Sequence, residues 1–241
     1  PGVGEKTEKK LWKNGTRHWD HVSNTSAISS NKRQKIESFL EKARRNLEVG
    51  NSYFFGEKLP NKSLWRAYRN FEQDACFFDI ETTGLDKKRN RVTTAAFHRN
   101  GSTEVLVRGD DLTRENLKAQ IEKSSMLVSF NGKKFDQPFL EHSFDLEMET
   151  PHLDLMYPCK RIGLTGGLKR IEKEIGVDRG LEDVDGREAV RLWKKYENNG
   201  NTEALEKLVE YNGYDAENLR QVLEIVHGRL DNRFFRQHLS D

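Results

Sequence analysis

A short apolar run that ends in two acids constrains the fold of this chain most strongly. Residues 76–85 read CFFDIETTGL, in which Phe78 and Ile80 alternate with Asp79 and Glu81. The run has the length of a buried strand, and Thr-Thr-Gly after it is typical of a turn. With the two-residue period of a strand, both acids point to one side and both apolar residues to the other. The chain must therefore build a sheet that presents two neighbouring carboxylates.

The rest of the chain predicts an α/β fold, in which a mixed sheet is flanked by helices and preceded by a small helical N-terminal region. The expected strands are 75–80, 92–98, 103–107, 126–130 and 151–157, and the expected helices are 31–49, 111–123, 168–175, 187–198 and 203–230. Asn100-Gly101 predicts a two-residue hairpin. We expect a helical region at 1–48, an irregular linker with aromatic anchors at 49–73, the α/β domain at 74–230 and a tail at 231–241.

Composition limits the classes of protein that fit. The chain has 241 residues, with 41 basic and 39 acidic side chains and a net charge of +2, so any contact with nucleic acid must come from local basic patches. Cys76 and Cys159 lack metal-ligand spacing, and Cys76, in an apolar run, indicates a buried, reduced thiol of a cytoplasmic protein. We see no signal peptide or membrane span and expect no membrane partner. We also expect a monomer, and residues upstream of Pro1, which falls inside a motif.

Two further motifs contain acids that fit a common site. Asp136, in FNGKKFDQPFL, begins a helix after a buried strand. Tyr211 and Asp215, in EYNGYDAENL, are four residues apart and share one face of a late helix. The sequence offers no reason for Gly213, which interrupts that helix.

Each motif taken alone has two readings. The first two acids fit a pair of solvated carboxylates at a strand end, Asp136 fits an acid favoured by the helix dipole, and Tyr211 fits a packed core residue. In the alternative, the crowded carboxylates need a counter-charge in order to stay ionised. Mg²⁺ or Mn²⁺, which prefer oxygen ligands, would supply it.

The order of these motifs resembles the DEDD (DnaQ-like) exonuclease superfamily, in the subgroup that uses tyrosine. With HLDL, GGLKRIEKEIG and DGREAVRLWKKY, the chain from about Trp65 to Leu219 is more narrowly similar to the YprB-type ribonuclease-H-like family. The resemblance implies a ribonuclease-H-like fold and two divalent metal ions, Mg²⁺ or Mn²⁺. It also implies that Tyr211 is a catalytic residue that orients or helps to deprotonate the attacking water. The other catalytic residues, which would also be the metal ligands, are Asp79, Glu81, Asp136 and Asp215.

Basic and small residues suggest where a nucleic acid would bind. Gly166 in GLTGGLK precedes a helix, and the N-terminus of a helix binds phosphate well when the phosphate can approach the backbone closely. The candidates around the acids are Thr82, Asn131, Lys133, Lys134, Lys160, Arg161, Thr165, Gly166, Lys169 and Arg170. A solvated basic face explains the same residues. The aromatic and basic residues 233–236 fit either a stacking platform or core packing of the tail.

The N-terminal segment PGVGEKTEKKLW resembles half of a helix-hairpin-helix element, in which Gly2 and Gly4 would bind a DNA phosphate. A hairpin used only for packing is the alternative. We therefore expect a 3′–5′ exonuclease that acts on single-stranded nucleic acid, with DNA favoured over RNA by this segment, in a role such as DNA repair. The rivals are a structure-specific endonuclease on the same fold and a non-catalytic module that recruits a helicase or polymerase.

Overall fold

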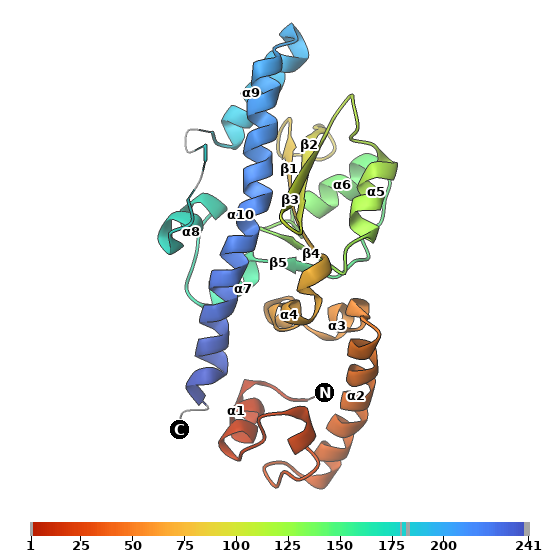
Figure 1. Ribbon diagram of the computed structural model, residues 1–241, viewed down its shortest axis with the longest axis vertical. Coiled ribbons are helices and arrows are strands. Elements are labelled where there is room, and N and C mark those ends of the chain that lie inside the picture. The colour runs from red at the N-terminus through yellow and green to blue at the C-terminus, as the bar shows by residue number, and fades with distance from the viewer. Residues whose placement is uncertain (1, 179, 182–183, 239–241) are drawn as a thin grey trace.

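The computed structural model, which describes residues 2–178, 180–181 and 184–238, contains a five-stranded mixed sheet (Figure 1). The strand order is β3-β2-β1-β4-β5. β2 pairs antiparallel with both β1 and β3, and β4 and β5 extend the sheet parallel to β1. The strands are β1 (Ala75–Thr82), β2 (Val92–Arg99), β3 (Ser102–Val107), β4 (Met126–Ser129) and β5 (His152–Asp154). The expected mixed α/β sheet is confirmed.

The predicted hairpin joins β2 to β3. Asn100 and Gly101 have φ angles of 52° and 76°, which is the left-handed pair that a type I′ turn requires. Asparagine tolerates this region and glycine enters it freely, so the two-residue turn lets the strands pair without a gap. The hairpin therefore forms as the sequence predicts.

Alternation along β1 decides which face of the sheet carries the acids. Phe78 and Ile80 pack on the face covered by α5 (Arg114–Glu122) and α6 (Asp136–Phe144). Phe77 belongs to the core on the opposite face. Since neighbouring strand residues point to opposite faces, Asp79 and Glu81 share the side of Phe77.

A single long helix, α10 (Thr202–Phe234), covers that opposite face. Its 33 residues rise roughly 50 Å at 1.5 Å per residue, and it packs against β1, β2 and β3 before it continues past the sheet (Figure 1). Around it lie α7 (Met156–Arg161), α8 (Leu168–Ile175) and α9 (Gly186–Asn199). This arrangement sets the residues of α10 directly against the acids of β1.

The N-terminal region packs against the tail and the sheet domain. It contains α1 (Glu5–Lys13) and α2 (Ser30–Glu48), and α2 is buried at Ile36, Leu40 and Ala43. The Trp12 ring lies 5.2 Å from that of Phe235, centroid to centroid. This contact supports core packing of the tail over a stacking platform.

Residues 49–73 are helical, so the prediction of irregular structure there is wrong. They form α3 (Ser52–Lys58), a 3₁₀ turn (Asn61–Arg66) and α4 (Tyr68–Phe71). Their large side chains are buried in the main core, most deeply Trp65 and Tyr68. Burial of these rings stabilises short helices whose intrinsic helix propensity is weak, so the local sequence does not predict them. The aromatic anchors themselves are confirmed.

Two smaller expectations concern the thiols and the membrane. Cys76 is free and buried, as expected, and Cys159 is also free and buried. Among the described residues, the helices lack the combination of length and apolar character that a bilayer span requires.

Candidate active site

Three carboxylates meet where β1 lies against α10. One oxygen each from Asp79, Glu81 and Asp215 lies within 4.8 Å of the other two. Strand alternation brings the first two to the face that α10 covers. Asp215 comes from the buried side of that helix, one turn after Tyr211. Residues far apart in sequence thus form one acidic cluster.

Asp136 lies beside this cluster rather than within the 4.8 Å set. It is the first residue of α6 and is only 4% exposed. Its Oδ1 accepts a hydrogen bond of 3.2 Å from the backbone N–H of Ile80, which ties it to the strand of the acids. The structure brings all four predicted acids to one cavity, with Asp136 slightly apart.

Burial and mutual repulsion disfavour ionisation of these acids. Burial raises the pKa of Asp79 well above its usual value, and the charges of Asp136, Asp215 and Glu81 raise it further. A hydrogen bond of 2.8 Å from the Asn212 amide to Asp79 Oδ2 acts in the opposite direction. Burial also raises the pKa of Asp136 to about 7, against the effect of its backbone hydrogen bonds.

This donor set fits a divalent metal ion. The clustered ligand atoms are carboxylate oxygens, which Mg²⁺ and Mn²⁺ prefer. Carboxylates with raised pKa values in a buried cluster are stabilised in their charged form when a cation neutralises them. Asp79, Glu81 and Asp215 are the residues that would hold it, with Asp136 at the edge of the site.

Tyr211 lies among the same acids. Its side chain is buried, and burial raises its pKa above the usual value, with further contributions from Asp215 and Glu81. The phenol therefore stays protonated and can donate a hydrogen bond. The ammonium of Lys169 lies 5.7 Å from the centroid of the Tyr211 ring and donates to the carbonyl oxygen of Val184.

Asp154, which the sequence analysis did not select, fixes the loop that delivers Asp136. Its Oδ1 accepts hydrogen bonds from the backbone N–H groups of Asn131 at 2.8 Å and Met156 at 3.0 Å. Its Oδ2 accepts from the N–H of Lys133 at 3.3 Å. Asn131 has a left-handed φ of 63°, so the loop turns sharply at this point. An acid after a strand-like run, in HLDL, was the available sequence signal.

Gly132, in the same loop, occupies a space that admits no side chain. A Cβ added there would lie 2.1 Å from Ser129 Oγ and 3.3 Å from Asp136 Oδ2. Ser129 Oγ is itself hydrogen-bonded to His152 Nε2 at 2.7 Å, in the buried interior. A glycine is therefore required where the backbone passes closest to the fourth acid.

The acids form the floor of a cavity of about 900 Å³. Of the residues predicted to bind nucleic acid, Thr82, Asn131 and Lys169 line it. Thr82 Oγ1 donates a hydrogen bond of 2.8 Å to the Gly84 carbonyl oxygen and so shapes the turn after β1. The cavity wall also includes residues that the sequence analysis missed, from the start of α9.

The other predicted nucleic-acid contacts do not line this cavity. Lys133 donates to Asn61 Oδ1 at 2.6 Å and faces a different hollow. Arg161 is held by an ion pair of 2.6 Å to Glu5 and stacks on Phe234, with its guanidinium carbon 4.0 Å from the ring centroid, which occupies it in packing. The remaining candidates outside the lining are Lys134, Lys160, Thr165, Gly166, Arg170, Gly2 and Gly4.

The last two belong to the N-terminal region. Gly2 and Gly4 precede α1, which Figure 1 places beside the C-terminal end of α10 and away from β1 and α9. Both are exposed, and Gly4 is the N-cap residue of α1. They can therefore contact nucleic acid only at a distance from the acids.

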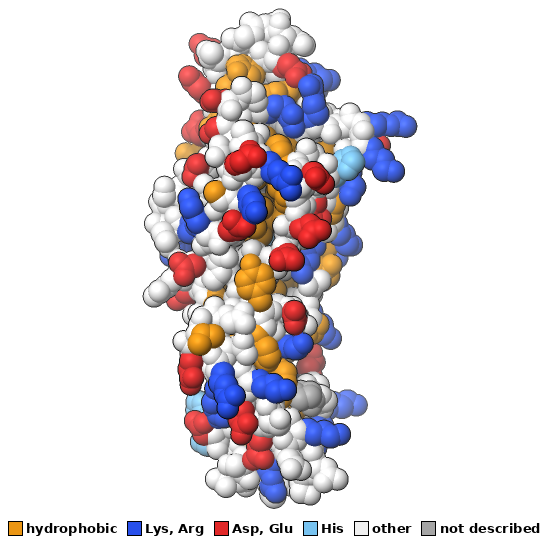
Figure 2. Space-filling model, turned by 90° about the vertical axis from the view of Figure 1, so that its right-hand side faces the viewer, with side chains coloured by type: hydrophobic (Ala, Val, Ile, Leu, Met, Phe, Trp, Pro, Cys, Tyr) orange, Lys and Arg blue, Asp and Glu red, His pale blue; other side chains and the backbone are white. Residues whose placement is uncertain are grey.

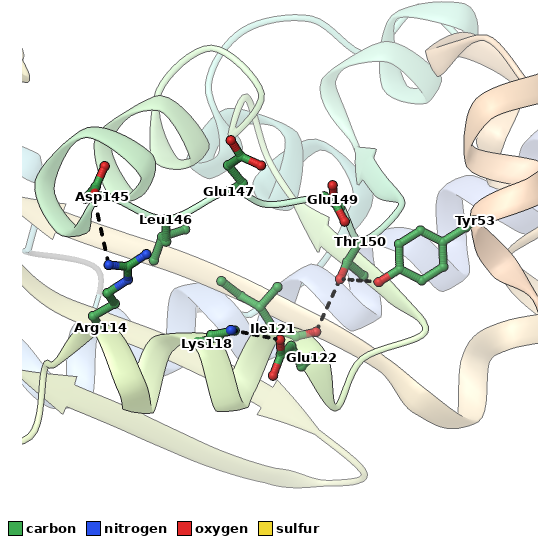
Figure 3. A pocket seen from close by; sticks show the side chains of 10 residues that line it. All are labelled: Tyr53, Arg114, Lys118, Ile121, Glu122, Asp145, Leu146, Glu147, Glu149 and Thr150. Atoms are coloured by element: carbon green, nitrogen blue, oxygen red, sulfur yellow. Dashed lines mark hydrogen bonds and ion pairs between the residues drawn. The ribbon is translucent and has the colours of Figure 1, made fainter.

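A second cavity, of about 490 Å³, lies between α5 and the segment after α6 (Figure 3). Arg114 pairs across it with Asp145 at 3.8 Å, and Lys118 pairs with Glu122 along α5 at 3.5 Å. Among the described residues, its lining includes none of the predicted catalytic acids. We therefore place the candidate active site in the larger cavity.

Comparison with protein families identifies the class. A model of the RNase H superfamily matches residues 76–227, which is more than half of the chain. This span contains every strand from β2 to β5, nearly all of β1, and all four acids. The chain belongs to the RNase H superfamily.

Solved structures resemble the chain at low identity. A structure described as the apo form of a nuclease is 20% identical, with a TM-score of 0.50, over 70% of this chain and 79% of its own. Brucella melitensis NrnC bound to pGG is 20% identical over 72% of this chain and 81% of its own, with a TM-score of 0.49. The same protein with bound Mg²⁺ is 22% identical over 72% and 82%, with a TM-score of 0.49. No curated protein matches the chain at a significant level.

Proposed function

We propose that this protein is a metal-dependent 3′–5′ exonuclease that hydrolyses phosphodiester bonds of single-stranded nucleic acid, with DNA preferred over RNA. The observation that carries the proposal is the set of carboxylate oxygens from Asp79, Glu81 and Asp215 within 4.8 Å at the floor of a cavity. Membership of the RNase H superfamily supports nuclease chemistry at this position. The motif order further supports the tyrosine subgroup of DEDD exonucleases and its YprB-type branch.

The acids would bind two divalent metal ions, Mg²⁺ or Mn²⁺. Such ions supply a hydroxide from bound water and stabilise the leaving oxygen of the phosphodiester. Asn212 donates to Asp79 Oδ2 and so fixes the carboxylate that the strand presents. Asp154 holds the loop before Asp136 through two backbone hydrogen bonds, from the N–H groups of Asn131 and Lys133. These two residues keep the acids in place before substrate arrives.

Tyr211 would orient the attacking water rather than deprotonate it. Burial and the neighbouring carboxylates raise its pKa, so the hydroxyl keeps its proton and acts as a donor. A neutral donor near Asp215 would hold the water by a hydrogen bond but could not take its proton. This assignment selects one of the two roles that the family resemblance allows.

The preference for single strands and for DNA rests on separate features. The cavity has room for a strand end, about 900 Å³, above the acids. The exposed Gly2 and Gly4 in the N-terminal region are free to approach a DNA phosphate, independently of base sequence. A substrate that spans both regions would have to extend along the molecule.

The test is a time course on 5′-labelled single-stranded DNA and RNA of the same sequence, with Mg²⁺, Mn²⁺ or EDTA. We expect a ladder that shortens from the 3′ end, faster on DNA, and no product in EDTA. Asp79→Asn should nearly abolish the products, whereas Asp145→Asn, at an exposed position after α6, should not. Internal fragments at the earliest times would show an endonuclease, and binding without products would show a recruiting module. Full activity in excess EDTA would refute the metal site.

A further inference from the structure

We propose that one face of α9 is a phosphate-binding track that guides the strand toward the acids. This inference rests on the proposed function, since it concerns the substrate of the same cavity. It assigns a binding role to Arg187, Arg191 and Lys194, which together we call the α9 track. The chemical class that it would bind is the sugar-phosphate backbone of a single strand.

The first observation is geometric. All three cationic residues line the 900 Å³ cavity, together with Val190 between them. They are separated by four and three residues on a helix, so their side chains share one face. From the first to the last, the track covers roughly 10 Å of helix at 1.5 Å per residue. A row of this length can contact consecutive phosphates of one strand.

The second observation is that these charges are available. The side chains are exposed, and among the described residues Arg187 and Lys194 form no ion pair. Arg191 contacts Glu188 at 3.2 Å, but its side chain is 70% exposed, and pairs of this kind contribute little. A phosphate can displace Glu188 from Arg191 at a small cost in free energy. The guanidinium can then bind the phosphate through two parallel hydrogen bonds.

The third observation is that α9 is held rigidly against the catalytic helix. Its opposite face buries Leu192 and Trp193 in a cluster that includes Leu208 and Tyr211 of α10. The Asp185 side chain accepts from the first free N–H groups of α9 and fixes its start. The track therefore keeps a constant position relative to Tyr211.

The α9 track carries charges of one sign. On the side of the molecule that Figure 2 shows, acidic and basic side chains are interspersed, so phosphate would meet both signs there. Along the α9 track the cations follow one another, and the acids of the same cavity are gathered at its floor and at Asp185. Contacts to phosphate carry no base information, so binding through the track should tolerate any sequence.

The test measures binding rather than cutting. Fluorescent single-stranded oligonucleotides are titrated with Ca²⁺ in place of Mg²⁺, between 50 and 200 mM salt. Each phosphate contact to a single strand contributes about 0.7 to the slope of log K against log salt, so the triple change Arg187→Gln, Arg191→Gln, Lys194→Gln should lower the slope by about 2. Over that fourfold salt range, wild-type affinity should fall roughly twenty-fold more than that of the variant.

Lys195→Gln is the matched control. Lys195 is exposed on the same helix but does not line the cavity, so its removal should leave the slope unchanged. If the triple variant has a lower melting temperature than the wild type, the single change Lys194→Gln should still lower the slope by about 0.7. An unchanged slope in these variants, or an equal drop per charge in Lys195→Gln, would overturn the track.

The result also separates this inference from the proposed function. If the triple variant shows the predicted loss of slope but the wild type never cuts the strands it binds, the exonuclease is refuted and the track is supported. A wild-type protein that shortens strands from the 3′ end while the triple variant binds normally would refute the track alone.

Discussion

Replacing Asp136 with asparagine should change how the stability of the metal-free protein depends on pH. Burial raises the pKa of Asp136 to about 7 in the folded state, from an ordinary value of 3.8. The folded protein therefore binds this proton more tightly than the unfolded chain does. The resulting stabilisation is fully present below about pH 4 and is lost as the pH rises toward 7.

The size of this effect follows from the two pKa values. Their difference is about 3, which at 1.36 kcal/mol per pKa unit corresponds to at most about 4 kcal/mol of unfolding free energy. Asparagine keeps an oxygen that can accept from the Ile80 N–H but has no proton to lose. It also removes a negative neighbour from Asp79. Between pH 4 and 7, the wild type should therefore lose stability relative to Asp136→Asn.

Urea unfolding in EDTA at pH 4, 5, 6 and 7 measures this difference. Asp145→Asn is the control, because Asp145 directly follows the same helix and its side chain is fully exposed. Its curve should parallel that of the wild type. Mg²⁺ added at pH 7 should then stabilise the wild type more than Asp136→Asn. If the wild type and Asp136→Asn lose the same stability between pH 4 and 7, the burial argument for this acid is wrong.

Three further substitutions test individual residues of the site. Tyr211→Phe keeps the packed ring but removes the donor, so turnover of single-stranded DNA should fall about 10²–10⁴-fold with little change in metal titration; a wild-type rate would make Tyr211 a core residue. Gly213→Ala should raise the unfolding free energy by up to about 1 kcal/mol, because its Cβ would lie 3.6 Å from Thr103 and Val105, an ordinary contact; a lower melting temperature would contradict this. Gly132→Ala should cost roughly 1–3 kcal/mol and reduce activity, since Ser129 would have to move; a variant as stable and active as wild type would show that the loop adapts.

The sequence predicted the sheet and the acids because both depend on local rules. Alternation along β1 places Asp79 and Glu81 together whatever the rest of the chain does. Helical spacing does the same for Tyr211 and Asp215. Each of these pairs is determined by two to five residues, and the structure keeps both arrangements.

The supporting residues depend on contacts between distant segments, which no local pattern reveals. Asn212 reaches Asp79 across 133 positions of sequence, and only the register of α10 on β1 brings them within 2.8 Å. Asp154 ends a strand, as predicted, but its structural role comes from two N–H groups of the distant loop at Asn131 and Lys133. The aromatic residues of 49–73 likewise formed helices because a core was present to receive them.

The α9 track also depends on a contact between distant segments, which the local sequence does not reveal. The sequence predicts a helix over 187–198, and the structure buries Leu192 and Trp193 and leaves Arg187 and Lys194 exposed. The sequence does not say what these cations face. That depends on how α9 docks on α10, the helix that also carries Tyr211. Because α10 carries Tyr211 and Asp215 and also holds α9, a change in the α9–α10 contact should disturb substrate binding and catalysis together.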